Sequence, residues 1–382
     1  MHTTKKIGLA ALLALGALGA RAADFVPEEV TVGVLPPATP YRLYVSDVAI
    51  SHIVDGRLHI VEGDTMKYAG IVGTGLTGLS TLSPDRSELY VATTYLSKLN
   101  RGTRTDQVDV YDSRTLMLKA EIEIPPKHAQ ALPYKGTIAV TPDGRFIIVQ
   151  NATPASSITI VDRRSAKFVT EVPTPGCWGI LPAQGVANRF TTVCGDGTLL
   201  TVTLDAEGKP AGQQRSERLF DPDQDPVFTQ TENNGDTYHF LSFNGQLRTA
   251  NLGGPVAKIE GAWSLLTDED RKANWRPGGY QPFALNVAAG RLYVAMHPNG
   301  AEGSHKNPAA EIWAFDLATK QRVERVEGNN AVSLAVSRGP NPMLFAIDPL
   351  SAGLVSYATA PKLAVGKRVD GFGEAPILIE TH

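Results

Sequence analysis

Histidine is the first residue type to consider for chemistry in this chain, because imidazole is the commonest side-chain ligand of transition metals. The sequence has eight histidines, and six of them are scattered between its two ends: His52, His59, His128, His239, His297 and His305. None of their spacings forms HxxxH or HExxH, the patterns that bring two imidazoles to one ion. We expect each to be a structural or surface residue. The loop between His297 and His305 is rich in glycine, proline and asparagine, and it is a candidate for binding.

Motifs for nucleophilic catalysis and for phosphate binding are missing as well. The chain has no GxSxG, SxxK or Walker sequence, and GTGLTG (73–78) lacks the following helix that a phosphate cradle requires. Its loop carboxylates do not follow the DxDxDG spacing of a calcium loop. They are Asp223, Asp225, Asp268, Glu269 and Asp270. The sequence predicts no self-contained catalytic or metal site, and this is typical of a platform that presents loops to another chain.

Cys177 and Cys194 are the only cysteines of the chain, in PGCWGI and TVCGDG. In an exported protein a disulfide is the default state of such a pair. No CxxCH sequence predicts covalent haem, and no CxxC pair predicts a zinc site.

A repeated unit carries these residues. Seven β-rich runs each end in a polar turn, at 58–65, 108–115, 158–165, 200–208, 246–254, 311–319 and 354–360. A second hydrophobic run precedes each of them, at 42–47, 88–94, 145–151, 189–197, 238–243, 291–297 and 343–348. Seven units of about four short strands, repeating every 40 to 50 residues or so, indicate an all-β fold. The prediction is a seven-bladed β-propeller of four-stranded antiparallel blades.

The turns between the units support this architecture. SPDR (83–86) and TPDG (141–144) place Pro, Asp and Gly where an inner strand reverses into the next. In the third strand of one unit, Val108 and Val110 alternate with Asp109 and Tyr111, as expected for sheets that pack face to face.

Two segments depart from the repeat. About twenty extra residues at 262–281 predict a short helix on a loop, with Thr267 as its N-cap. The C-terminal APILIE (375–380) resembles an inner strand, and it is expected to complete the blade begun by RLYVSD (42–47) and so close the ring.

The N-terminus predicts export. Residues 1–22 contain Lys5 and Lys6, an apolar run and an Ala-Arg-Ala site, which together are typical of a secretory signal peptide cleaved after Ala22. Residues 23–40 would then form an N-terminal arm and 41–382 the propeller. No later segment approaches 18 consecutive apolar residues, so no membrane span is expected in the mature chain.

The charge of the chain argues against nucleic-acid binding. Loss of Lys5, Lys6 and Arg21 with the signal peptide would take the formal net charge from −3 to −6. A mildly acidic chain lacks the basic footprint of a nucleic-acid binder. The local basic spots at 101–106 and 162–164 are expected to be solvated turns.

Several long segments resemble the heavy subunit of the periplasmic quinoprotein amine dehydrogenases. They are TTYLSKLNRGTRTDQVDVYD (93–112), VQNATPASSITIVD (149–162), GCWGILP with TTVCGDGTL (176–199), WSLLTDEDRKANWRPGGYQ (263–281) and MHPNGAEGSHKNPAAEIW (296–313). The resemblance spans most of the mature chain. It is strongest to the aromatic-amine (aralkylamine) branch, which is related to the methylamine dehydrogenase heavy chain.

The resemblance implies a propeller without a cofactor of its own. Two such heavy chains would assemble with two small light chains into a heterotetramer, and each light chain would carry tryptophan tryptophylquinone. The complex would oxidise primary, aromatic amines to aldehyde and ammonia in the periplasm. Electrons would pass to a small copper protein such as azurin or amicyanin. The heavy chain would dock the light chain and shape the substrate channel.

Individual residues follow from the same resemblance. Leu76 takes the place of a phenylalanine that the family usually has at the substrate entrance, so a wider or differently shaped channel is expected, although Leu76 is also consistent with a buried loop hydrophobe. Cys177 and Cys194 coincide with the heavy-chain disulfide of the family. Arg101, Arg104 and Asp106 resemble a family loop, in which an Arg–Asp pair would rigidify the turn.

Four further residues are candidates for the light-chain interface: Trp263, Trp275, Tyr280 and His305. Aromatic side chains concentrate in the buried centre of interfaces, but packing of the 262–281 insertion explains its aromatic residues equally well.

Two rival functions remain open from sequence. The first is a free-standing periplasmic propeller that binds a ligand or serves as a scaffold. The second is a propeller hydrolase or lactonase with a metal in its central channel, which needs inward-facing carboxylates or histidines at equivalent blade positions. The blade turns do not supply them.

Overall fold

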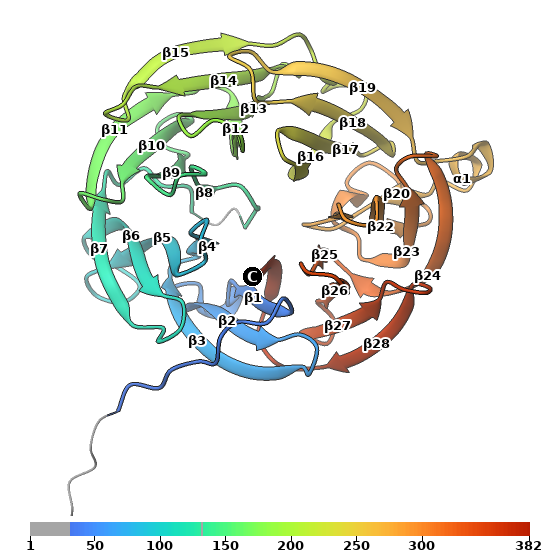
Figure 1. Cartoon of the computed structure of the whole chain (residues 1–382), viewed down its shortest axis with the longest axis horizontal. Helices are drawn as coiled ribbons and strands as arrows, with labels where there is room; N and C mark the ends of the chain where they lie inside the picture. The colour runs from blue at the N-terminus through green and yellow to red at the C-terminus, as the bar shows by residue number, and fades with distance from the viewer. Residues whose placement is uncertain (1–30, 131–132) are drawn as a thin grey trace, which may run out of the picture. The chain divides into compact units, whose positions relative to one another are not determined.

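Seven antiparallel sheets follow one another around a central axis in the computed structural model of the protein (Figure 1). The structure describes residues 31–130 and 133–382. Within these residues six sheets have four strands and one has five. The predicted seven-bladed all-β propeller is therefore confirmed, and we number the blades 1 to 7 in chain order.

Each blade extends from an innermost strand at the axis to an outermost strand at the rim. In that order, blade 1 contains β29 (Pro376–Thr381), β1 (Arg42–Asp47), β2 (Gly56–Glu62) and β3 (Lys67–Gly75). Blade 2 contains β4 (Leu79–Leu82), β5 (Glu88–Leu96), β6 (Arg104–Asp112) and β7 (Leu118–Ile124). Blade 3 contains β8 (Ile138–Val140), β9 (Phe146–Asn151), β10 (Ser157–Asp162) and β11 (Lys167–Pro173). Blade 4 contains β12 (Cys177–Pro182), β13 (Arg189–Cys194), β14 (Leu199–Leu204) and β15 (Pro210–Arg215).

The remaining blades follow the same order. Blade 5 contains β16 (Val227–Asn234), β17 (Thr237–Ser242), β18 (Gln246–Asn251) and β19 (Lys258–Ser264). Blade 6 contains β21 (Phe283–Asn286), β22 (Arg291–His297), β23 (Ala309–Asp316) and β24 (Gln321–Ala331), with β20 (Arg276–Pro277) paired to the end of β22. Blade 7 contains β25 (Ser333–Val336), β26 (Met343–Asp348), β27 (Gly353–Ala358) and β28 (Ala364–Val369). Helix α1 (Asp268–Lys272) and the 3-10 turns η1 (Ile50–His52) and η2 (Ser304–Lys306) lie in loops.

The middle strands of the blades are buried on both faces. All six residues of β9 and of β10 are buried, whereas all six residues of β15 are exposed. This pattern arises because each blade packs both of its faces against its neighbours, so that middle strands are wholly inside and outermost strands border solvent. The alternation predicted for the third strand of blade 2 therefore does not separate core from solvent, because Asp109 is as buried as Val108 and Val110.

The C-terminal strand completes the first blade, as predicted. β29 is the innermost strand of blade 1 and pairs antiparallel with β1, with Tyr44 opposite Glu380. Asp47, the last residue of β1, holds the segment that leads into β29. Its carboxylate accepts hydrogen bonds from the backbone N–H groups of Glu374 at 2.7 Å and Ala375 at 2.9 Å.

A buried glutamine joins the closing strand to the other blades. The Gln281 side chain donates to the Ile379 carbonyl at 3.0 Å and accepts from the Ile379 N–H at 2.6 Å. Gln281 is also bridged to Ser333 of β25, whose hydroxyl donates to the Ile377 carbonyl. The side-chain amide therefore acts as a one-residue strand partner for β29.

The insertion between blades 5 and 6 contains the predicted helix. Thr267 is its N-cap, and the Thr267 and Asp270 side chains form a reciprocal capping box, which satisfies two backbone N–H groups of the first turn. Within the described residues, no helix is long and apolar enough to cross a membrane. The predicted signal peptide (1–22) and the first part of the predicted arm (23–40) lie outside the described residues.

Candidate functional site: the loop face and the central channel

The topology divides the connections of the propeller between two faces. Adjacent strands are antiparallel, so the links between successive blades emerge on the same side as the loops that join the second and third strands of each blade. We call this side the loop face and the opposite side, which carries the tight hairpins, the turn face. Leu76, the Cys177–Cys194 pair, α1 and the 298–308 loop all belong to the loop face. The segments that carry the sequence resemblance thus converge on one side.

The loop face carries the most exposed large hydrophobic side chains. Leu350 is 76% exposed, Leu99 is 74% exposed and Ile50 is 68% exposed, which are the highest values among such residues in the described parts of the chain. They lie in the second-to-third-strand loops of blades 7, 2 and 1, which are neighbours in the ring. We call the three loops that carry Ile50, Leu99 and Leu350 the apolar loops. Exposed apolar side chains on adjacent loops make the loop face a candidate docking surface.

Leu76 occupies the link between blades 1 and 2. It is half-buried, and its N–H donates to the Thr94 carbonyl at 3.1 Å. The preceding Gly75 has φ +61°, and a Cβ there would clash with Thr93 Oγ1 and lie 3.0 Å from Tyr95 Cε1. Only glycine allows the backbone at position 75 to lie this close to β5, so the turn is held tightly against the end of that strand. Leu76 is therefore neither a fully buried core residue nor a fully exposed one.

A polar cluster centred on buried Asp109 of blade 2 lies at the border with blade 1. Asp109 accepts hydrogen bonds from the Tyr95 hydroxyl at 2.7 Å, from the Tyr111 hydroxyl at 3.4 Å and from the Gln107 side chain. Burial raises the pKa of Asp109, and the hydrogen bonds from Gln107 and Tyr95 offset only part of that effect. Tyr111 also donates to the Gly73 carbonyl of blade 1 at 3.4 Å. We call Tyr95, Gln107, Asp109 and Tyr111 the Asp109 cluster.

The two cysteines form a disulfide, as predicted. Cys177 begins β12 and Cys194 ends β13, and the two residues are directly opposite each other in the ladder. Regular pairing between these strands is interrupted between Trp178 and Leu181. The disulfide therefore fixes the loop-face end of the inner strand of blade 4, where the ladder alone is incomplete.

The two tryptophans predicted for the interface pack inside blade 6 and its border with blade 5. Trp263 is half-buried and meets the Phe315 ring edge-on at 5.9 Å between centroids. Trp275 is also half-buried, lies 5.0 Å from the buried Trp313 ring, and is covered by the Arg325 guanidinium at 5.2 Å. This geometry assigns them the packing role that the sequence left open, while an additional contact with a partner stays a prediction.

Tyr280 and His305 lie apart from that packing. Tyr280 is half-buried, with its ring centroid 6.1 Å from that of Tyr134, and the Lys306 ammonium lies 5.4 Å from the Tyr280 ring and 5.8 Å from the Tyr134 ring. His305 is exposed and contributes its carbonyl to Gly279. Of the four predicted interface residues, His305 alone is exposed on the loop face.

The Arg104–Asp106 ion pair and the histidines His128 and His297 lie in surroundings that indicate a structural role. Arg104 makes a two-pronged ion pair with buried Asp106, which also accepts from the His128 N–H, as the rigid-turn interpretation predicted. Burial lowers the pKa of His128 to about 4, so its imidazole is neutral at neutral pH. Burial likewise lowers the pKa of His297, whose Nε2 has no hydrogen-bond partner.

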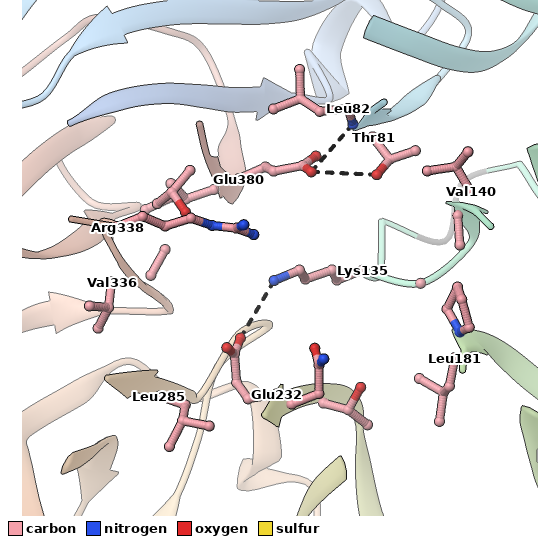
Figure 2. Close-up of a pocket in the computed structure, with 18 of the residues that line it drawn as sticks. Thr81, Leu82, Lys135, Val140, Leu181, Glu232, Leu285, Val336, Arg338 and Glu380 are labelled. Atoms are coloured by element: carbon pink, nitrogen blue, oxygen red, sulfur yellow. Dashed lines mark hydrogen bonds and ion pairs between the residues drawn. The ribbon is translucent and has the colours of Figure 1, made fainter. Parts of the chain in front are cut away.

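The central channel is a second candidate site. It encloses about 830 Å³ and is lined by inner strands and by hairpins of the turn face. Figure 2 shows the Lys135 and Arg338 side chains reaching into it between Glu232 and Glu380. Lys135 pairs with Glu232 at 3.5 Å, and burial raises the pKa of Glu380. Across residues 31–130 and 133–382, no three His, Cys, Asp or Glu side chains form a group that could hold a metal ion.

Sequence reasoning missed several residues that the fold makes prominent. The apolar loops, the Asp109 cluster and the channel charges carry no motif, because a strand tyrosine or a loop leucine resembles any other in one sequence. Their positions depend on register between strands far apart in the chain. The one usable signal was Gly75, whose place before Leu76 is consistent with a close backbone approach.

Comparison with known proteins gives the family. The model of the methylamine dehydrogenase heavy chain family matches residues 39–382. Methylamine dehydrogenase heavy chains of Methylophilus methylotrophus and Paracoccus versutus are 24% and 27% identical, over 95% and 91% of this chain and 88% and 80% of their own.

Solved structures agree in fold. The Kuenenia stuttgartiensis hydrazine synthase matches with a TM-score of 0.56 and 14% identity, over 90% of this chain and 99% of its own. A dihydro-heme d1 dehydrogenase matches with a TM-score of 0.54 and 17% identity, over 92% of this chain and 78% of its own. At such low identity these two likenesses show the propeller fold alone. The family match covers nearly all of the described residues, and the chain belongs to the methylamine dehydrogenase heavy chain family.

Proposed function

We propose that this chain is the heavy subunit of a periplasmic amine dehydrogenase that oxidises primary amines to aldehyde and ammonia. Two heavy chains assemble with two light chains, and each light chain carries tryptophan tryptophylquinone. Electrons leave to a small copper protein of the azurin or amicyanin kind. The family match over residues 39–382 is the observation that carries this proposal.

The surface of the propeller supports the docking role. Ile50, Leu99 and Leu350 are exposed on neighbouring blades of the loop face, close in the ring to the Leu76 turn. Covering one leucine or isoleucine side chain contributes roughly 1.5–3 kcal/mol, so three of them provide the apolar centre of an interface. The occupant that we assign to this surface is the light chain.

The contribution of this chain to the reaction is the wall of the substrate entrance. The quinone of the light chain accepts the two electrons taken from the amine. Leu76 presents an apolar side chain on rigidly held backbone, which excludes water and limits which carbon chains approach. In this proposal the heavy chain orients the substrate and excludes water, and it does not supply a reacting group.

An aromatic amine is the substrate class that we propose. The curated relatives are named for methylamine, whereas the 296–313 segment is more similar to the aromatic-amine branch. Leu76 in place of an aromatic side chain leaves more room at the entrance, because leucine is smaller than phenylalanine. Added room favours a substrate bulkier than methylamine.

The proposal is tested on protein purified from the periplasm of its native host. We expect intact-mass analysis to find a small co-purifying chain, and a visible quinone band to bleach when tyramine, phenylethylamine or methylamine is added. The amine that bleaches it fastest gives the substrate class. A colourless chain that purifies alone would instead support a free-standing propeller that binds a ligand or serves as a scaffold.

A further inference from the structure

An exposed tyrosine of the next blade, Tyr95, lies close to the Leu76 turn. Tyr95 directly follows the buried part of β5, and its Cε1 would lie 3.0 Å from a Cβ at Gly75. The Leu76 N–H is bonded to the carbonyl of Thr94, the residue before Tyr95. These two contacts place the Tyr95 ring beside the backbone that carries Leu76.

Tyr95 presents a ring to solvent and keeps its hydroxyl inside. The residue is 38% exposed, although its hydroxyl donates to the carboxylate of Asp109, which is 1% exposed. The surface therefore offers an apolar ring beside Leu76, while the polar end of the side chain is already bonded. A ring with two side-chain torsions and an anchored hydroxyl loses little conformational entropy when it binds a ligand.

The anchor of this ring spans two blades. Asp109 is held by Gln107 and Tyr111 of blade 2, and Tyr111 also donates to the Gly73 carbonyl of blade 1. Gly73 and Leu76 belong to the same β3-to-β4 segment. The Asp109 cluster therefore fixes the Tyr95 ring relative to the turn rather than merely relative to its own strand.

We propose that Tyr95 is a specificity-determining residue of this subunit, which supplies at the entrance the aromatic surface that Leu76 lacks. The ligand it fits is the carbon chain of a primary amine with an aryl or similarly extended apolar group, and methylamine is too small to use it. This inference rests on the proposed function, because it requires a light chain docked on the loop face.

The physical basis is the apolar and quadrupolar character of the ring. An aromatic pair contributes about 0.5–1.5 kcal/mol beyond the area that it buries. A contact of that size changes kcat/KM by roughly three- to ten-fold for the amine that makes it. An amine without an apolar group makes no such contact and should be nearly insensitive to the ring.

The test compares heavy-chain variants in the assembled complex, with phenylethylamine and methylamine as substrates. We expect Tyr95→Leu to lower kcat/KM for phenylethylamine roughly three- to ten-fold, mainly through KM, and to leave methylamine within about two-fold. Tyr95→Phe keeps the ring but removes its hydrogen bond to Asp109, so it should change the ratio between the two amines less than Tyr95→Leu does. Tyr68→Leu is the matched control, because Tyr68 is also exposed and hydroxyl-bonded but lies at the far end of β3.

The outcomes separate this inference from the function on which it rests. If the wild-type complex oxidises amines and Tyr95→Leu leaves the ratio between phenylethylamine and methylamine unchanged, Tyr95 is not a specificity residue. Equal losses for both amines, or equal effects of Tyr95→Leu and Tyr95→Phe, overturn it in the same way. A wild-type preparation without light chain or amine oxidation removes the proposed function, and the role of Tyr95 with it.

Discussion

At the scale of single residues, Asp47 shows how one carboxylate holds the ring closed. It accepts from the Glu374 and Ala375 N–H groups, from the Ala49 N–H at 2.9 Å, and from His59 Nε2 at 3.2 Å. Burial alone would raise the pKa of Asp47, but the hydrogen bonds from His59 and the backbone outweigh it and hold the pKa far below its usual range. The folded protein therefore stabilises the ionised form of the Asp47 carboxylate.

We expect Asp47→Asn to destabilise the protein by roughly 2–3 kcal/mol, because buried donors lose a charged acceptor. Since the folded pKa is lowered, the stabilisation by Asp47 is complete above the unfolded pKa of about 3.9 and is lost as the pH falls below it. The difference between variant and wild type should accordingly be constant near neutral pH and shrink in acid. Urea unfolding at several pH values measures it.

Asp55→Asn is the control for that experiment. Asp55 lies in the neighbouring loop, and its ion pair with Arg57 is exposed, so little change in unfolding free energy is expected. If both variants unfold like the wild type at neutral pH, Asp47 does not hold the closing segment.

Residue chemistry was only partly predictable from the sequence. The Cys177–Cys194 disulfide could be predicted because the sequence predicts export and each of the two cysteines has a single possible partner. Tyr95 and Asp109 could not, since their meeting depends on the register of β5 against β6, in which Tyr95 pairs with Thr105. Trp263 and Trp275 were singled out as candidate interface residues, but the sequence could not distinguish this role from the packing against Phe315 and Trp313 that the structure shows.

At the scale of elements, the inner strand of blade 4 depends on its disulfide. β12 pairs with β13 at Cys177 and Trp178, and again only from Leu181 onwards. Between these points the Ile180 N–H donates to the carbonyl of Gly136, which lies just before β8 of blade 3. The disulfide closes the 17-residue separation between the cysteines across this interrupted ladder.

Replacing both cysteines by serine should lower the free energy of unfolding by roughly 3 kcal/mol in the chain-entropy model. The measurement is denaturant unfolding of the double variant beside wild type with and without reductant. Reduced wild type and the double variant should then agree. An unchanged midpoint in both would show that the ladder and neighbouring links hold β12 without the disulfide.

Element boundaries illustrate what sequence patterns capture. The helix after Thr267 and the closing strand at 375–380 were both predictable, because capping residues and a spare hydrophobic run are local signals. The short β20, which makes blade 6 five-stranded, was not predictable, because a two-residue strand containing Pro277 has no periodicity.

At the scale of the whole molecule, closure uses Gln281 as well as β29. Gln281 is fully buried and makes two hydrogen bonds with the backbone of Ile379. It therefore connects the start of blade 6 to the last strand of the chain. The number of blades was predictable from the repeat, but this connection was not, since a glutamine after a Pro-Gly-Gly-Tyr stretch gives no sign of its partner.

Gln281→Leu should destabilise the propeller by roughly 2–4 kcal/mol, because the N–H and carbonyl of Ile379 would be left buried without partners. Thermal and urea unfolding followed by circular dichroism measure the loss. Gln214→Leu on the exposed β15 is the control and should change little. A Gln281→Leu protein as stable as this control would mean that β29 is held by its pairing with β1 alone.

Assembly with the light chain is the property of the whole molecule that the loop face predicts. Leu99→Glu places a carboxylate where an apolar side chain would be buried in the interface, so the heavy chain should bind the light chain at least ten-fold more weakly. The matched control is Met117→Glu, because Met117 is an exposed hydrophobic residue of the same blade on the turn face. Native mass spectrometry of co-expressed chains measures the assembled fraction, and unfolding midpoints confirm that both variants fold.

Equal assembly of the two variants would place the light chain elsewhere than on the apolar loops. Selective loss with Leu99→Glu would show that the light chain covers the loop face, and therefore that Leu76 and Tyr95 lie on the side from which the amine reaches the quinone.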